Sequence, residues 1–189
     1  MNHSESPFWN LPNALTILRI GVIPLIIFLM TFPGRFPSFL AAAAFLAAGM
    51  TDLLDGFFAR RQRLVTRAGK FMDPLADKLL VSAALIMLIP LGRVEAWLVF
   101  VIIGRELAVT GLRAIAASEG YIIAADRWGK IKTIVQMVAL FSLILHYSYG
   151  PIDFQHLGTA LIWLAAIITV ASGISYFVTF FQSTSAPSA

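Results

Sequence analysis

Cysteine is absent from this sequence, and charged side chains of either sign are scarce. Without cysteine the chain can build neither a disulfide framework nor a thiolate metal site. The three histidines, His3, His146 and His156, share no spacing typical of metal ligands, so a bound metal ion is expected to have oxygen ligands. Only 13% of the 189 residues are charged, about half the share usual in a soluble domain, which argues against a water-exposed surface over most of the molecule.

Apolar residues are abundant instead, and they are grouped in long segments. They make up 59% of the chain, and the mean hydropathy is +0.83. Six apolar segments each approach the length of about 20 residues that a helix needs to cross a membrane. They cover residues 15–30, 38–52, 71–91, 94–113, 130–147 and 157–181. The sequence therefore predicts an all-α integral membrane protein in which residues 1–189 form one domain of six transmembrane helices, with residues 1–14 as a short N-terminal interfacial segment.

Basic residues are divided unevenly between the predicted connectors. Most of them lie around the second and fourth connectors: Arg60, Arg61, Arg63, Arg67, Lys70, Arg127, Lys130 and Lys132. The opposite side has only Arg35 and Arg93. Because basic connectors tend to stay in the cytoplasm, this asymmetry predicts a multi-pass protein with both termini on the cytoplasmic side. The net charge of +4 suits anionic lipids and phosphate-bearing substrates, and no nucleic-acid partner is expected.

Four aspartates within residues 52–77 are the largest departure from this apolar background. Asp52 and Asp55 are three residues apart, and Asp73 and Asp77 are four apart, so each pair lies on one face of a helix. A carboxylate close to hydrocarbon is costly unless it has a partner. Two such faces turned toward each other would form a four-carboxylate site for a hard divalent cation, Mg²⁺ or Mn²⁺. In the predicted orientation this site opens to the cytoplasm.

Buried acids in membrane helices also have other uses. They can relay protons, or they can pair with neighbouring basic residues such as Arg60, Arg61 or Lys70. A proton-coupled transporter would be expected to show inverted repeats or helices broken at the membrane midplane. The sequence has no convincing internal repeat of this kind, and the spacing of the residues around the aspartates favours the metal site.

The aspartates belong to a longer pattern, D-x-x-D-G-x-x-A-R-x8-G-x-x-x-D-x-x-x-D, which begins at Asp52 and ends at Asp77. This pattern resembles the signature of the CDP-alcohol phosphotransferases, in which a CDP-linked lipid donates its phosphatidyl group to an alcohol and CMP is released. The resemblance implies a metal-binding, a CDP-lipid-binding and a catalytic set of residues. These sets are Asp52, Asp55, Asp73 and Asp77 for metal, Gly56, Ala59, Arg60 and Gly69 for the CDP-lipid, and Asp77 as general base. Two divalent ions suit an in-line displacement at phosphorus.

Further segments are similar to one branch of that family, the bacterial phosphatidylglycerophosphate synthases. They lie within residues 10–19, 71–80, 105–113 and 129–136. This resemblance implies CDP-diacylglycerol as donor, sn-glycerol 3-phosphate as acceptor, a place in the bacterial inner (cytoplasmic) membrane among its lipids, and a homodimer. Arg105 and Arg113 are eight residues apart, roughly two helical turns, so they are expected to share a face. With Lys132 they offer three cations for the phosphate of the acceptor, which an uncharged acceptor would not require.

Two other enzymatic interpretations stay open at this point. A sister enzyme of the same family would keep the chemistry but use inositol phosphate or phosphatidylglycerol as acceptor. An intramembrane prenyltransferase also uses paired aspartate motifs with Mg²⁺, but it resembles a longer bundle with more helices than 189 residues can easily supply.

Overall fold

The protein is described here by a computed structural model, which covers residues 11–62, 67–118 and 127–185. Within these ranges, the side chains of residues 11–12, 52–62, 67–71, 127–128, 130, 181 and 183–185 lie outside the description. The described part is almost entirely α-helical. Its helices are α1 (Leu11–Met30), α2 (Arg35–Gln62), α3 (Arg67–Leu88), α4 (Ala96–Ser118), α5 (Arg127–Leu145) and α6 (Phe154–Ser185). The predicted all-α fold is therefore confirmed, and each predicted apolar segment corresponds to one helix.

Several helices begin earlier or end later than predicted. α1 begins at Leu11 rather than at residue 15, so residues 11–14 belong to the helix and not to a separate interfacial segment. Pro12 does not prevent this, because the first turn of a helix has no intrahelical partners for its N–H groups. α3 begins at Arg67, within the connector predicted from its basic residues. Residues 1–10 and 63–66 lie outside the described residues.

A short hairpin that was not predicted separates α5 from α6. Its strands are β1 (Ser148–Tyr149) and β2 (Ile152–Asp153), which pair in antiparallel fashion. Gly150 and Pro151 form the two-residue turn, and Gly150 has a φ of 62°. Glycine tolerates this left-handed conformation, which tight hairpin turns require. The sequence predicts a helix end near residue 147, before the turn residues Gly150 and Pro151, but α5 ends at Leu145. The intervening strands are too short to leave a periodic pattern.

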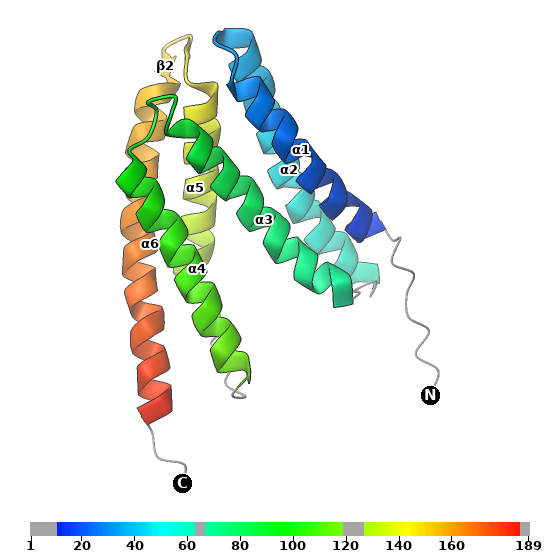
Figure 1. The fold of residues 1–189 in the computed structure, drawn as a ribbon, viewed down its shortest axis with the longest axis vertical. Helices are drawn as coiled ribbons and strands as arrows, with labels where there is room; N and C mark the ends of the chain where they lie inside the picture. The colour runs from blue at the N-terminus through cyan, green and yellow to red at the C-terminus, as the bar shows by residue number, and fades with distance from the viewer. Residues whose placement is uncertain (1–10, 63–66, 119–126, 186–189) are drawn as a thin grey trace.

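The helices run up and down, so that their ends lie at two opposite ends of the bundle (Figure 1). We call the end with β1 and β2 the hairpin end. We call the other the open end, where α1, α3 and α5 begin and α2, α4 and α6 end. α1 packs along both α2 and α3, and α5 packs along α6 and α2, whereas α2 and α3 have little direct contact with each other.

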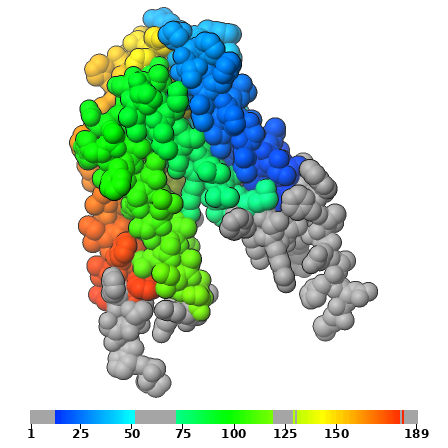
Figure 2. Space-filling model, in the orientation of Figure 1, coloured from blue at the N-terminus to red at the C-terminus, as the bar shows by residue number. Residues whose placement is uncertain are grey.

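The main hydrophobic core occupies the half of the bundle near the hairpin end. Its fully buried members include Ala41, Phe45, Leu85, Ile102 and Leu143. Small residues such as the alanines of α2 let the helices approach closely, as is usual where helices pack within a membrane. Toward the open end the helices diverge, and a hollow separates α4 from α1 and α3 (Figure 2). The bundle is thus held together at one end and leaves room for a site at the other.

Large apolar side chains also cover much of the outer surface. Phe36 is 71% exposed, Phe100 76% and Ile167 64%. An apolar surface of this extent is typical of contact with lipid and not with water. Two helices, over Asn13–Met30 and Phe154–Phe180, are long and apolar enough to cross a membrane, and Arg35–Thr51 and Ile131–Leu145 are shorter apolar helices. The described residues therefore contain two candidate spans, and the count of six remains a prediction.

Polar contacts close the hairpin end. The Nη1 atom of Arg93 donates hydrogen bonds to the carbonyl oxygens of Leu143 at 3.1 Å and Ile144 at 2.9 Å. These carbonyls belong to the last turn of α5, where a cation is favourable. Nearby, the hydroxyl of Tyr147 accepts a hydrogen bond from the backbone N–H of Gly34 at 3.1 Å. The connectors between α1 and α2, α3 and α4, and α5 and α6 are therefore tied together at this end.

Candidate functional site

The predicted metal ligands fall on two helices at the open end. Asp73 and Asp77 lie one turn apart on α3, and both are half-buried. Asp52 and Asp55 belong to the second half of α2, and their side chains lie outside the described residues. Because only residues 63–66 separate α2 from α3, the end of one helix has to lie near the start of the other. The end of α2 and the start of α3 are therefore close in space, as a site shared by the two helices requires.

The predicted CDP-lipid contacts lie on the same two helices. Gly56, Ala59 and Arg60 are in the last turns of α2, and Gly69 is in the first turn of α3. Their side-chain surroundings lie outside the described residues, so their predicted role stays a prediction. Their position between the two pairs of aspartates places them at the open end.

Thr16 of α1 contacts one of the predicted metal ligands directly. Its hydroxyl donates a hydrogen bond to Oδ1 of Asp73, with a distance of 2.6 Å between the two oxygens. Thr16 is fully buried, with 0% exposure. A hydrogen bond between a hydroxyl and a carboxylate is stronger than one between neutral groups. It holds the Asp73 side chain in one orientation.

A small cavity of about 50 Å³ lies beside Asp77, between α3, α4 and α5. Its polar lining comes from all three helices: Asp77, Lys78, Ser82, Glu106, Lys132, Thr133 and Gln136. Lys132 and Gln136 are only 5% and 4% exposed. Buried polar groups at this density have a cost unless they pair with each other or with a ligand, so the cavity is a candidate binding site.

Glu106 joins two of the three predicted phosphate-binding cations. Its Oε1 atom forms salt bridges with Nζ of Lys132 and with Nη1 of Arg105, the latter at 3.1 Å. The Nη2 atom of Arg105 donates a hydrogen bond to the hydroxyl of Ser172 on α6 at 2.8 Å. The guanidinium also lies over the ring of Tyr176, 5.8 Å from its centroid. Arg105 thus connects α4 with α6, while Lys132 lies in the cavity that contains Asp77.

Arg113, the third predicted cation, lies on the same helix as Arg105 but is exposed. Eight residues along an α-helix leave an offset of about 80°. Arg105 is turned toward α6, whereas Arg113 lies close enough to Lys78 of α3 to interact with it electrostatically. The structure therefore brings Lys132 and Arg105 together through Glu106, and it brings Arg113 near α3.

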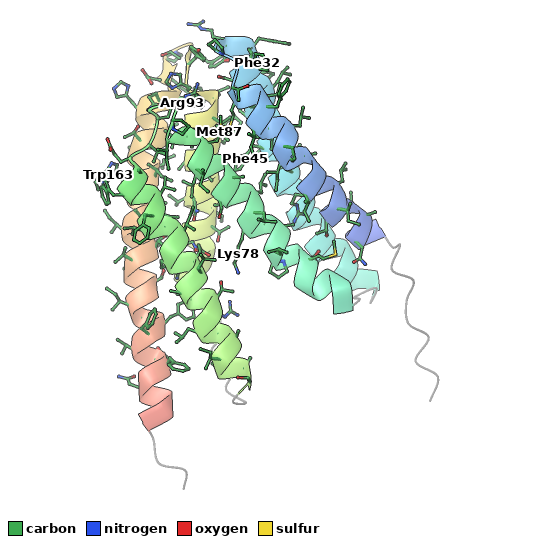
Figure 3. The ribbon with its side chains drawn as sticks, in the orientation of Figure 1. Phe32, Phe45, Lys78, Met87, Arg93 and Trp163 are labelled. Carbon is green, nitrogen blue, oxygen red and sulfur yellow. The ribbon has the colours of Figure 1, made fainter. Side chains whose placement is uncertain are left out.

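Lys78 is a site residue that the sequence reasoning did not identify. Figure 3 shows it on α3, and its side chain lines the cavity together with Asp77, Glu106 and Lys132. It interacts electrostatically with both Asp77 and Arg113. Its position directly after Asp77 was the only sequence signal, and that signal does not say which neighbouring helix the side chain meets.

Comparison with known proteins identifies the family. Residues 9–171 match the model of the CDP-alcohol phosphatidyltransferases, and the chain belongs to that family. Among curated relatives, one from Bacillus subtilis (strain 168) is 46% identical over 182 residues, which are 89% of this chain and 94% of that protein. One from Rickettsia typhi is 43% identical over 169 residues, covering 89% of this chain and 95% of that protein. One from Haemophilus influenzae is 36% identical over 174 residues, covering 89% of this chain and 91% of that protein.

All three relatives bear the name CDP-diacylglycerol–glycerol-3-phosphate 3-phosphatidyltransferase. The resemblance seen in residues 52–77 is therefore confirmed, and the chain is an enzyme of the phosphatidyltransferase class. The family is associated with membranes, in agreement with the apolar surface and the two candidate spans.

The family generally uses divalent metal ions, and the described side chains fit such an ion. Asp73 and Asp77 present oxygen ligands one turn apart, and the bond from Thr16 holds one of them in place. Within the described side chains there is no group of three possible metal ligands, since Asp52 and Asp55 lie outside them. The described part of the site is thus half of the predicted ligand set, with the chemistry that a hard cation prefers.

Proposed function

We propose that this enzyme transfers the phosphatidyl group of CDP-diacylglycerol to sn-glycerol 3-phosphate, which yields phosphatidylglycerophosphate and CMP. The observation that carries this proposal is the similarity to relatives of that name over 89% of the chain, at up to 46% identity. Lys78 and Lys132, which line the cavity beside Asp77, add support, because they suit an acceptor that carries a phosphate.

In the proposed reaction, Asp52, Asp55, Asp73 and Asp77 hold two divalent ions, Mg²⁺ or Mn²⁺. When bound, the ions offset the negative charge that develops on the phosphate oxygens and on the leaving CMP. Gly56, Ala59, Arg60 and Gly69 bind the cytidine diphosphate part of the donor. Gly56 and Ala59, both small, leave space for a bulky nucleotide close to the backbone of α2.

Asp77 acts as the general base in this proposal. A hydroxyl oxygen of the acceptor forms a bond to the phosphatidyl phosphorus, its proton passes to the carboxylate of Asp77, and the bond between phosphorus and the CMP oxygen breaks. A tightly ligated carboxylate is a poor base, so Asp77 has to be at most weakly bound to metal. The position of Asp77 at the wall of a cavity, and not within the packed core, gives an acceptor hydroxyl access to it.

In this proposal the acceptor phosphate is bound by four basic side chains, those of Lys132, Arg113, Arg105 and Lys78. Lys132 and Lys78 line the cavity beside Asp77, so a phosphate bound by them brings the rest of a three-carbon acceptor to the base. Glu106 keeps the two buried cations Arg105 and Lys132 compensated before the acceptor binds.

The proposed setting is the bacterial cytoplasmic membrane, with six spans and with the open end on the cytoplasmic side. Both ends of the described chain lie at the open end, as an even number of spans requires (Figure 1). CDP-linked and phosphorylated substrates are then on the same side as the site. A homodimer is proposed from the resemblance alone.

The test is a transferase assay with purified protein in detergent. CDP-diacylglycerol is supplied with sn-glycerol 3-phosphate, glycerol, inositol phosphate or phosphatidylglycerol, and CMP release and the lipid product are measured. We expect turnover with glycerol 3-phosphate, and its loss when EDTA removes divalent ions. Faster turnover with any other acceptor would assign the protein to a sister branch, and CMP release that resists EDTA would exclude the metal site.

A further inference from the structure

α1 carries a polar face that the proposed reaction does not yet explain. Asn13, Thr16 and Arg19 follow one another at intervals of three residues, so they share one side of the helix. They are 1%, 0% and 2% exposed, in a helix that otherwise is strongly apolar. Burying an arginine and two other polar side chains in such a helix costs free energy, so their contacts have to offset that cost.

Thr16 reaches from α1 to the carboxylate of Asp73 on α3. The two residues are 57 positions apart in the chain, and the bond between Oγ1 and Oδ1 is 2.6 Å long. A threonine in a membrane helix usually donates its hydroxyl hydrogen to a carbonyl one turn earlier in the same helix. Here it donates to a predicted metal ligand of another helix.

Arg19 reaches from the same face of α1 to α2. Its Nε atom donates a hydrogen bond to the carbonyl oxygen of Ala48 at 3.1 Å. The hydroxyl of Thr51 donates to the same oxygen at 2.7 Å. Ala48 lies one helical turn before Asp52, the first predicted metal ligand. The contact therefore anchors α2 just before its carboxylates.

These two contacts matter because, in the part of the chain that the structure describes, few contacts join α2 directly to α3. Each packs along α1 instead. α1 therefore contributes to the relative position of the two carboxylate-bearing helices. In known metal sites, groups that hydrogen-bond to the ligands contribute to metal affinity by fixing the orientation of those ligands.

We propose that the polar face of α1 positions the metal ligands, with Thr16 as the positioning residue of Asp73 and Arg19 as the anchor of α2. The proposal rests on the metal site of the proposed function. Thr16 fixes one oxygen of the Asp73 carboxylate, so the rotamer that binds metal is already selected before the ion arrives. Without the hydroxyl, the carboxylate is fixed in one rotamer only when the ion binds, and the cost of fixing it lowers the metal affinity.

The experiment measures metal binding directly, without substrate. Binding of Mn²⁺ to the detergent-solubilised protein is followed by electron paramagnetic resonance for the wild type, Thr16→Val, Thr16→Ala and Thr16→Ser. Valine has nearly the shape of threonine but lacks the donor. We expect Thr16→Val and Thr16→Ala to weaken Mn²⁺ binding by about 10- to 100-fold. We expect Thr16→Ser, which keeps a hydroxyl, to bind nearly as the wild type does.

Thr179→Val is the matched control. Thr179 is exposed on α6, and its hydroxyl donates to the carbonyl of Ser175 in its own helix at 2.9 Å. This change should leave Mn²⁺ binding unaltered. The thermal midpoint without metal is recorded for every variant, so that a loss of fold is distinguished from a loss of affinity.

The outcomes separate this inference from the proposed function. Equal Mn²⁺ affinity in the wild type and in folded Thr16→Val would overturn the positioning role, even if glycerol 3-phosphate is the acceptor. Weakened binding in Thr16→Val but not in Thr16→Ser would support it, even if another acceptor is preferred. A wild type that binds no Mn²⁺ would overturn both the inference and the metal site on which it rests.

Discussion

Lys132→Met removes a buried charge from the cavity beside Asp77 and keeps a side chain of similar length. Lys132 is 5% exposed, and its ammonium group pairs with Glu106. Glu106 still has Arg105 as a partner at 3.1 Å after the change, so its carboxylate is not left unpaired. We therefore expect the variant to fold.

The expected effect follows from the loss of one charge-assisted hydrogen bond to the acceptor phosphate. Such a bond contributes about 1.5–3 kcal/mol. At about 1.4 kcal/mol per factor of ten, kcat/KM for glycerol 3-phosphate should fall by about ten- to a hundredfold. The KM for CDP-diacylglycerol should change little, because the proposed donor contacts lie on α2 and at the start of α3.

The assay is a pair of saturation curves, one for each substrate, for the wild type, Lys132→Met, Lys78→Met and Arg113→Ala. A second variant, Lys132→Met combined with Glu106→Gln, separates two possible roles of the lysine. If Lys132 binds phosphate, removing the acid as well does not restore acceptor kcat/KM. Recovery of acceptor kcat/KM in the double variant would show that Lys132 only neutralises Glu106. Equal losses of kcat/KM for the donor and for the acceptor would also refute a role in phosphate binding.

Three further predictions concern the metal ligands, the topology and the start of α6. Replacing any one of Asp52, Asp55, Asp73 or Asp77 by asparagine should remove most activity while the bundle stays folded, because a neutral ligand binds a divalent ion far more weakly; wild-type turnover in two of these variants would contradict the site. Single cysteines at Arg63 and Arg127 should be labelled only from the cytoplasmic side, and those at Arg35 and Pro151 only from the other side, in a chain that has no native cysteine to interfere; labelling of any position from the wrong side would disprove the six-span topology. The backbone N–H of His156 donates a hydrogen bond to Oδ1 of Asp153 at 3.0 Å, and this bond lowers the pKa of the Asp153 carboxyl. Asp153 therefore stabilises the fold at pH values above its unfolded pKa of about 3.9. This stabilisation is lost as the pH falls through the lowered pKa of the folded state. Asp153→Ala should therefore lower the thermal midpoint at neutral pH but not in strong acid, and Asp153→Asn, which can still cap the helix, should have a smaller effect.

Much of the fold was accessible from the sequence because helices leave local signals. Long apolar segments separated by turn residues such as Gly150 predicted each of the helices. The exact ends were less accessible, as the early start of α1 shows. Pro12 suggests a helix boundary in isolation, but in the first turn it costs no hydrogen bond. The strands of the hairpin were missed, since two residues each are too few for a periodic pattern.

The candidate site, too, could be predicted from the sequence only in part. The spacing of Asp73 and Asp77 depends on one helix only, so their common face could be read from the sequence. Arg105 and Arg113 show the limit of this reasoning. Their spacing suggests one face, but the residual offset of about 80° and the length of the side chain allow Arg105 to reach Ser172 on α6.

The sequence by itself determined the helices, the abundance of apolar surface and the signature between Asp52 and Asp77, since each depends on residues close together in the chain. Only the tertiary structure decided that Lys78 shares a cavity with Lys132, that Glu106 pairs with both Lys132 and Arg105, and that Thr16 holds Asp73. Side chains on different helices meet according to how those helices pack, and packing is a property of all the apolar faces together. No local spacing specifies which two of those faces come into contact.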